Sequence, residues 1–293
     1  MSRRRRASHG PPTSHRRDLP TEPVPTSLGT ARLVREPGAP HLVTLLLDQA
    51  ESSYLDLADP THLEFEYMQQ MEVVLDAARP AGRVRALHLG GAACALARAV
   101  DARRPRSTQL AVELDEVLAG LVREWFDLPR SPRLRIRTGD ARAVTESLRE
   151  GSWEVVVRDV FDRAEVPRHV RTLEAAAAVH RVLVPGGLYL VNLTHRPPLA
   201  DARVEVATLQ TVFRDVVLVT DPAILNGRRY GNVVLAASDA PLPVDEIGRG
   251  VRRLPLPVRM LHGAELTRFR GTSVPERDPV GRPDRETTEA RTS

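Results

Sequence analysis

Apolar residues near the start of the chain follow two different spacings. Residues 31–36, 41–48 and 53–57 (ARLVRE, HLVTLLLD and SYLDL) are short apolar-rich runs separated by the turn-prone PGAP and the polar QAES. Such runs are typical of strands, so we predict a small antiparallel sheet before the main domain. Residues 61–78 change to helical spacing, with Pro60 and Thr61 as start signals. We expect this helix to lead into the core.

From Arg83 onwards, strand-like runs alternate with helical patterns. RVRALHLGG, STQLAVELD, RLRIRTGDA, WEVVVRDVF and LYLVNLT are each followed by a helical segment, and RDVVLVT and GNVVLAAS follow as two adjacent strands. Apolar strands that alternate with helices form a mainly parallel sheet covered on both faces. We therefore predict an α/β fold of the class I S-adenosylmethionine-dependent methyltransferase-like Rossmann type. It has a mainly parallel seven-stranded sheet, an antiparallel edge and the small N-terminal antiparallel β-sheet.

Composition divides the chain into five parts. The two ends are rich in Arg, Pro, Ser and Thr, and they contain too few large apolar residues to offset the entropy of ordering. We predict disordered tails at 1–29 and 271–293, N-terminal strands and a helix at 30–80, a Rossmann-like nucleotide-binding catalytic domain at 81–245, and a C-terminal extension at 246–270. The extension contains the amphipathic segment VRMLHGAELTRF, which is suited to docking on the domain.

The positive charge of the chain is concentrated at its N-terminus. The formal net charge is +4, yet residues 1–20 alone contain six arginines and a single acidic residue, Asp18. The remainder is close to neutral, so we expect no nucleic-acid partner except through this tail. A single cysteine, Cys94, excludes an internal disulfide and a cysteine-based metal cage. With no apolar run long enough for a membrane span or signal peptide, we predict a cytoplasmic protein with no membrane association and no metal.

Three successive strand ends carry residues suited to a nucleoside. Gly90 and Gly91 lie at the first strand-to-helix turn, where the backbone can approach a ligand. Glu113 ends the next strand, at the spacing of a carboxylate that accepts both ribose hydroxyls. Asp140 follows the third strand, where it can accept a hydrogen bond from the adenine amino group. Singly, each carboxylate could be a solvated loop residue; together they predict one nucleoside site.

Two further carboxylates, Asp159 and Asp162, follow the fourth strand. Paired carboxylates attract an ammonium group, and one of them can accept the proton that an attacking amine loses. The alternative is that one caps the next helix and the other is solvated. Arg158 is expected to point to the opposite face of the strand, and His88 is expected to be a hydrogen-bonded core residue.

The order of these motifs resembles the spermidine synthase family of polyamine aminopropyltransferases over residues 45–235. The segment SSYLDLADPTHLEFEYMQQM is similar to the family's N-terminal strand and gate helix, and Tyr67 matches the tyrosine that lines the substrate pocket. LHLGGAACALARAV resembles the Gly-rich turn, VELDEVL the ribose-binding segment with Glu113, and GDAR the adenine-side segment with Asp140. DVFD matches the family's Asp-x-x-Asp, which places Asp159 at the reacting amine and Asp162 at the substrate.

The resemblance implies transfer of an aminopropyl group from decarboxylated S-adenosylmethionine to an amine such as putrescine. Decarboxylated S-adenosylmethionine is then a co-substrate, and no tightly bound cofactor and no metal are needed. The resemblance also implies a homodimer that forms through the N-terminal strands.

The chain departs from the family pattern at three places. Ala92 and Ala93 stand in the Gly-rich turn where the family has a glycine and an aspartate, Arg163 replaces a proline, and Ile224 stands where a second tyrosine is expected. These departures keep two alternatives open. One is a small-molecule methyltransferase that uses intact S-adenosylmethionine, and the other is a non-catalytic nucleotide-binding paralogue.

Overall fold

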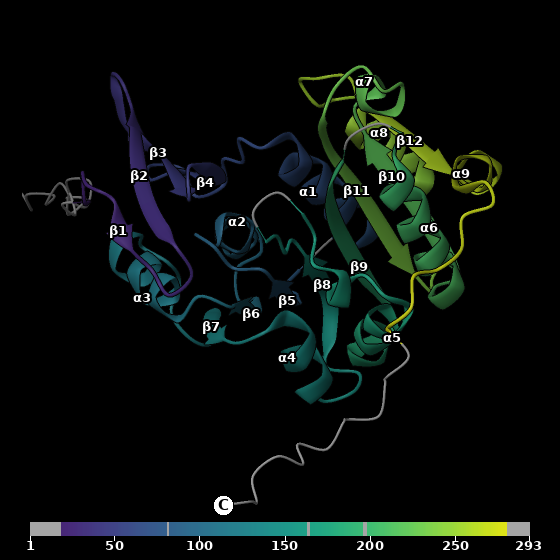
Figure 1. Cartoon of the computed structure of the whole chain (residues 1–293), viewed down its shortest axis with the longest axis horizontal. Coiled ribbons are helices and arrows are strands. Elements are labelled where there is room, and N and C mark those ends of the chain that lie inside the picture. Colours follow the sequence, from purple (N-terminus) through teal and green to yellow (C-terminus); the bar gives the residue numbers. More distant parts are fainter. Residues whose placement is uncertain (1–18, 81, 163–164, 196–197, 280–293) are drawn as a thin grey trace, which may run out of the picture.

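The computed structural model describes residues 19–80, 82–162, 165–195 and 198–279, which form a large central sheet, a smaller sheet and helices on both sides of the large one (Figure 1). The central sheet has eight strands in the order β12-β10-β11-β9-β8-β5-β6-β7. Its strands are β5 (Arg85–Leu89), β6 (Thr108–Glu113), β7 (Leu134–Thr138), β8 (Trp153–Arg158), β9 (Leu183–His195), β10 (Asp215–Thr220), β11 (Gly231–Ser238) and β12 (Arg259–His262). The pairs from β7 to β9 are parallel and the remaining pairs are antiparallel, which confirms the predicted α/β class.

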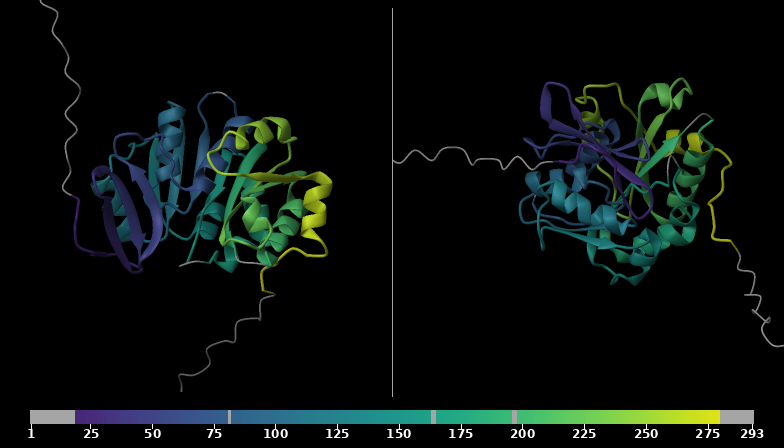
Figure 2. Two further views of the ribbon diagram at one scale, coloured as in Figure 1. Left: turned by 90° about the horizontal axis from the view of Figure 1, so that it is seen from above. Right: turned by 60° about the vertical axis from the view of Figure 1, so that its left-hand side comes forward.

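A second, antiparallel sheet stands at one end of the molecule, beside the edge that carries β7 (Figure 2). Its strands are β1 (Val24–Pro25), β2 (Thr30–Glu36), β3 (Ala39–Leu47) and β4 (Ala50–Asp56). Apolar residues of β2, β3 and β4 share a core with α2 and α3, including Leu45, Ala97 and Val122. The predicted N-terminal sheet is therefore confirmed, and it packs directly on the helices that flank the first turns.

Two sets of helices cover the central sheet, because its strands are apolar on both faces. On one face are α1 (Glu66–Ala78), α2 (Ala95–Arg103), α3 (Glu116–Trp125) and α8 (Val244–Val251). On the other are α4 (Ala141–Ser147), the short 3-10 helix η1 (Arg168–Val170), α5 (Leu173–Val182), α6 (Ala200–Val212) and α9 (Gly263–Arg270). The one-turn helix α7 (Pro222–Leu225) lies in the connection between β10 and β11.

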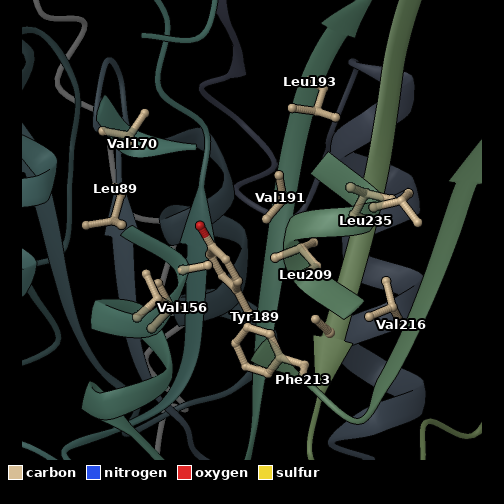
Figure 3. Packing of buried hydrophobic residues seen from close by; sticks show 14 of the residues in the cluster. Leu89, Val156, Val170, Tyr189, Val191, Leu193, Leu209, Phe213, Val216 and Leu235 are labelled. Carbon is tan, nitrogen blue, oxygen red and sulfur yellow. The ribbon is translucent and has the colours of Figure 1, made fainter. Parts of the chain in front are cut away.

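The second face contains the larger core, in which strand and helix side chains interdigitate (Figure 3). Tyr189 of β9 and Phe213 at the end of α6 lie with ring centroids 5.9 Å apart, and Val156 and Leu209 pack around them. His88 lies on the opposite face, buried, with its Nε2 2.9 Å from Gln109 Oε1. Burial lowers the pKa of His88 to about 4, so it is the neutral core histidine expected from its apolar strand.

The central sheet differs from the expected seven strands by the addition of β12. The segment VRMLHGAELTRF forms this strand and then α9, and β12 pairs with β10 at the sheet edge. Leu261 and Leu266 are buried in the core of the second face. A four-residue strand contains too few residues for periodicity to identify it, so the sequence indicated docking without the strand.

The described structure extends into both predicted tails. Residues 24–25 form β1, and the amides of Ser27 and Leu28 donate to the carboxylate of Asp115 at 3.0 and 2.9 Å. At the other end, Glu276 and Asp278 form ion pairs with arginines of the domain. These segments are held by hydrogen bonds and ion pairs, which a count of large apolar residues does not register.

The helix predicted for residues 61–78 begins five residues later, at Glu66. The Thr61 hydroxyl and amide both bind Asp59 Oδ1, at 2.7 and 2.8 Å, which forms a local turn in place of a helix start. Residues 1–18 and 280–293 of the two predicted tails lie outside the described residues, and so does Arg163. The arginines at positions 3–6, 16 and 17 belong to the first of these segments. Within the described part of the chain, no helix is both long enough and apolar enough to cross a bilayer.

Candidate active site

A cavity of about 1580 Å³ opens where the parallel strands of the central sheet end. Its walls come from the first turn, the ends of β6, β7 and β8, the N-terminal sheet, α1 and the loop before β11. Ligands of open α/β sheets bind at this edge, because loops and helix N-termini converge there. All seven residues predicted for the site line this one cavity: Tyr67, Gly90, Gly91, Glu113, Asp140, Asp159 and Asp162.

The first turn brings the backbone very close to the end of β8. Gly90 has a φ of +91°, and a Cβ there would lie 2.0 Å from the carbonyl oxygen of Asp159. Only glycine fits both the left-handed backbone and this approach. The Gly90 amide also donates to Val112 O at 3.0 Å, which ties the turn to β6.

Glu113 lies directly against this turn. Its Oε2 accepts from the amides of Gly91 and Ala92 at 3.2 and 2.7 Å, and its Oε1 accepts from the Asp115 amide at 3.0 Å. A carboxylate has about four lone-pair sites. Glu113 is thus oriented by the backbone and keeps acceptor capacity for hydroxyl groups at the cavity wall.

Asp140 has two partners of its own. Its Oδ1 accepts from the Ala143 amide at 2.8 Å and so caps α4, while Oδ2 lies 2.7 Å from His169 Nε2. Burial alone would raise the pKa of Asp140, but the hydrogen bonds from Ala143 and His169 outweigh it and hold the pKa below its ordinary value. Asp140 therefore presents an ionised carboxylate to the cavity.

Asp159 is held by two side-chain donors at the end of β8. Tyr67 Oη donates to Oδ2 at 2.9 Å, and Asn192 Nδ2 donates to Oδ1 at 2.8 Å. Asn192 is fixed in turn, because its Oδ1 accepts from Asn232 Nδ2 at 3.0 Å. Burial raises the pKa of Asp159, and the two hydrogen bonds only partly oppose it. A carboxylate with a raised pKa, fixed at a cavity wall, is suited to accept a proton.

Asp162 is exposed at the cavity wall, three residues after Asp159. Its backbone exchanges two hydrogen bonds with the backbone of Glu165, at 2.9 and 3.1 Å. Arg158 points away from the cavity, where it forms a buried ion pair of 2.7 Å with Glu205 and donates to Val170 O. The alternation expected for β8 is thus observed.

The described lining of the cavity is strongly acidic. It contains nine carboxylates and one arginine, Arg229. The guanidinium of Arg229 is bound at 2.7 Å by both Glu66 and Asp221, which raises its pKa and neutralises its charge. A cleft lined by one sign of charge raises the local concentration of the opposite ion, so this cavity favours a cation.

Sequence reasoning missed Asn192, Asn232 and His169. Asn192 gave one signal, since it is the only polar residue within the apolar run LYLVN and lies on the face of β9 that leads to Asp159. The other two gave none. Asn232 is 40 residues from Asn192 and His169 is 29 residues from Asp140, so only the sheet topology brings each pair together.

Comparison with solved structures finds a relative of substantial sequence identity. The crystal structure of a probable spermidine synthase from Corynebacterium glutamicum ATCC 13032 is 34% identical to the chain and covers 90% of it, with a TM-score of 0.84. The alignment extends over 98% of that protein. The chain belongs to the spermidine synthase family.

Solved structures of lower sequence identity share the fold. A spermidine synthase in complex with the transition-state analogue AdoDATO is 16% identical over 81% of this chain and 80% of its own, with a TM-score of 0.59. Human methyltransferase-like protein 13, in complex with SAH, is 18% identical over 75% of this chain and 95% of its own, with a TM-score of 0.50. No family model and no curated protein matches the sequence.

Proposed function

We propose that the chain is a spermidine synthase-like aminopropyltransferase, which moves an aminopropyl group from decarboxylated S-adenosylmethionine to an amine such as putrescine. The observation that carries this proposal is Asp159, fixed by Tyr67 and Asn192 in a cavity that favours cations. In this proposal Gly90, Gly91, Glu113 and Asp140 bind the nucleoside. Tyr67 and Asp162 bind the amine.

The reaction is a displacement at the carbon next to the sulfonium. The lone pair of the amine nitrogen forms the new N–C bond, the C–S bond breaks, and its electron pair returns to sulfur to give neutral methylthioadenosine. The nitrogen must lose a proton, because an ammonium has no lone pair with which to attack. Asp159 is the acceptor of that proton, and its raised pKa makes the transfer more favourable than for an ordinary aspartate.

The surroundings of Asp159 support the positioning of the amine against the nucleotide as the main source of the rate enhancement. Two donors and the Asn192–Asn232 contact fix the carboxylate in one orientation, so an amine bound there meets the nucleotide in a defined geometry. Such orientation replaces an encounter in solution with a step inside one complex. Another acidic lining residue, Glu64, attracts the charged remainder of the substrate.

The direct test is turnover of decarboxylated S-adenosylmethionine with putrescine, measured as release of methylthioadenosine. The wild-type protein is expected to turn over, and Asp159→Asn to be slower by about 10²–10⁴-fold, the usual contribution of a positioned base. Asp201→Asn is the matched control, because Asp201 lies on α6 and pairs with Arg171 outside the cavity. Equal rates for wild type and Asp159→Asn would contradict the proposal.

One observation favours a small-molecule methyltransferase as the second candidate. Ala93, at the position of the family's turn aspartate, is fully buried, and its amide is bound by Ser53 Oγ at 3.2 Å. The turn therefore presents no carboxylate that would repel the carboxylate of intact S-adenosylmethionine. A methyltransferase is expected to bind intact S-adenosylmethionine tightly, whereas an aminopropyltransferase is not.

A further inference from the structure

Residues 272–279, which we call the strap, pass from α9 to the outer side of η1 and α5 (Figure 1). Glu276 is its main anchor. The carboxylate of Glu276 binds Arg168 Nε at 2.7 Å and Arg171 Nε at 2.9 Å, and its carbonyl oxygen accepts from the Leu173 amide at 2.7 Å. The contact with Arg168 is a charge-assisted hydrogen bond, a type about twice as strong as a neutral one, whereas the contact with Arg171 is an ion pair without hydrogen-bond geometry. The strap is thus fastened to both ends of η1.

A second anchor connects the strap to α4. The carboxylate of Asp278 meets the guanidinium of Arg142 with Oδ2–Nη2 and Oδ1–Nη1 distances of 3.0 and 3.4 Å. The same Nη1 donates to the carbonyl oxygen of His169 at 3.0 Å. Arg142 is only two residues after Asp140, so its guanidinium joins the start of α4 to the backbone of η1, and Asp278 binds that guanidinium from the strap.

The inner side of η1 reaches the cavity. His169 Nε2 lies 2.7 Å from Asp140 Oδ2, and both residues line the cavity wall. Because the pKa of Asp140 is lowered, its carboxylate is ionised and acts only as an acceptor. His169 is therefore the donor in this contact, and it fixes the direction in which Oδ2 faces the cavity. A continuous set of contacts runs from Glu276 and Asp278 to this carboxylate.

We propose that Glu276 and Asp278 of the strap are positioning residues for the nucleoside subsite. Through Arg168 and Arg142 they keep His169 in contact with Asp140. They thereby set the preference of the site for adenine. This inference rests on the proposed function, which places the purine at Asp140. An ionised carboxylate accepts a hydrogen bond from the 6-amino group of adenine, whereas the 6-oxo group of hypoxanthine is an acceptor and is repelled. The preference holds only while the carboxylate is aimed at the purine edge.

The test compares the affinities for 5′-methylthioadenosine and 5′-methylthioinosine by titration calorimetry. The variant Glu276→Gln/Asp278→Asn is expected to reduce the preference for the adenine nucleoside by about tenfold, since charge-assisted contacts are lost. His169→Ala is expected to give a similar loss. Combining the two changes is expected to add little, because they act through one set of contacts.

Two controls separate positioning from a general loss of stability. Arg277→Gln lies between the two anchors and removes only an exposed contact of 3.5 Å with Glu174, so it is expected to leave the preference unchanged. A chain that ends after residue 279 retains both anchors and is expected to behave as wild type. Equal weakening of both nucleosides in the strap variant would overturn the proposal, because it would indicate a structural effect only.

The experiment also distinguishes this inference from the proposed function. Wild-type protein that binds neither nucleoside would overturn the proposed function and the role of the strap together. Wild-type protein that prefers the adenine nucleoside, with an unchanged preference in the strap variant, would overturn the strap alone. A reduced preference in the variant, with the wild-type preference intact, supports both.

Discussion

At the scale of single residues, Asp159 combines an energetic cost with a proposed chemical role. Burial raises its pKa, so the folded protein takes up a proton there more readily than the unfolded chain. For a carboxyl group with a raised pKa, stability is lost as the pH rises through the folded-state value. Above that pH the ionised group lowers the free energy of unfolding.

Asp159→Asn is expected to be more stable than wild type at pH 7, because the cost of a buried charge is removed. The asparagine can keep both neighbours, since its amide oxygen accepts from Asn192 while its nitrogen donates to the rotatable Tyr67 hydroxyl. Urea denaturation of both proteins checks this. A less stable variant at pH 7, or a gain that persists unchanged at pH 3, would contradict the assigned cause.

Tyr67→Phe removes one of the two donors that lower the pKa of Asp159. The pKa is then expected to rise further, so the acidic limb of the rate profile moves to higher pH. In wild type that limb is already expected above the ordinary aspartate pKa of about 3.9. The profile of kcat/KM against pH, measured for wild type and for Tyr67→Phe, gives the position of the acidic limb in each protein. An acidic limb at the same pH in both proteins would show that Asp159 is not the titrating group.

At the scale of secondary-structure elements, the first turn is the most constrained. Gly90→Ala is expected to lower the free energy of unfolding by more than about 2 kcal/mol, since a Cβ meets Asp159 O at 2.0 Å and the backbone is left-handed. Gly120→Ala is the control, because a Cβ in α3 meets no atom within 4 Å. The control is expected to be stabilised by up to about 1 kcal/mol. Chemical denaturation compares the two, and equal effects would contradict this account of the turn.

The alternating elements from β5 to β11 were predictable because each buries an apolar run or stripe that the sequence displays. Three features were not. β12 is too short for a periodic signal, and α1 starts after a turn that Asp59 and Thr61 form. The segment directly after β1 is held by backbone donors to Asp115. The contacts of Thr61 with Asp59 are local and those of Ser27 and Leu28 with Asp115 are distant, and neither kind appears as an apolar period in a single sequence.

The main residues of the candidate site were predictable from the sequence, but the residues that hydrogen-bond to them were not. Gly90, Glu113, Asp140 and Asp159 follow four successive parallel strands, so the topology alone places them at one sheet edge. Their partners were not predictable. Asn192 and His169 meet Asp159 and Asp140 only because β9 and η1 cross to these positions in space.

At the scale of the whole molecule, the cavity is acidic although the chain as a whole has a formal net charge of +4. The KM for putrescine is expected to rise with ionic strength, because salt screens the attraction between the carboxylates and a dication. The affinity for neutral methylthioadenosine is expected to stay nearly constant from about 0.02 to 0.3 M salt. Steady-state kinetics and calorimetry across that range provide the check, and a salt-independent KM would argue against electrostatic recognition of the amine.

The charge of the same cavity also determines which form of the nucleotide the protein is expected to bind. Decarboxylated S-adenosylmethionine carries two positive charges and no carboxylate, so the acidic lining favours it over the intact nucleotide. Titration calorimetry of the protein with decarboxylated S-adenosylmethionine, S-adenosylmethionine and methylthioadenosine is the most direct measurement. We predict binding of the decarboxylated form and of methylthioadenosine, each at least about tenfold tighter than the intact nucleotide. Preference for intact S-adenosylmethionine, or no binding of any of the three, would contradict the assignment as an aminopropyltransferase.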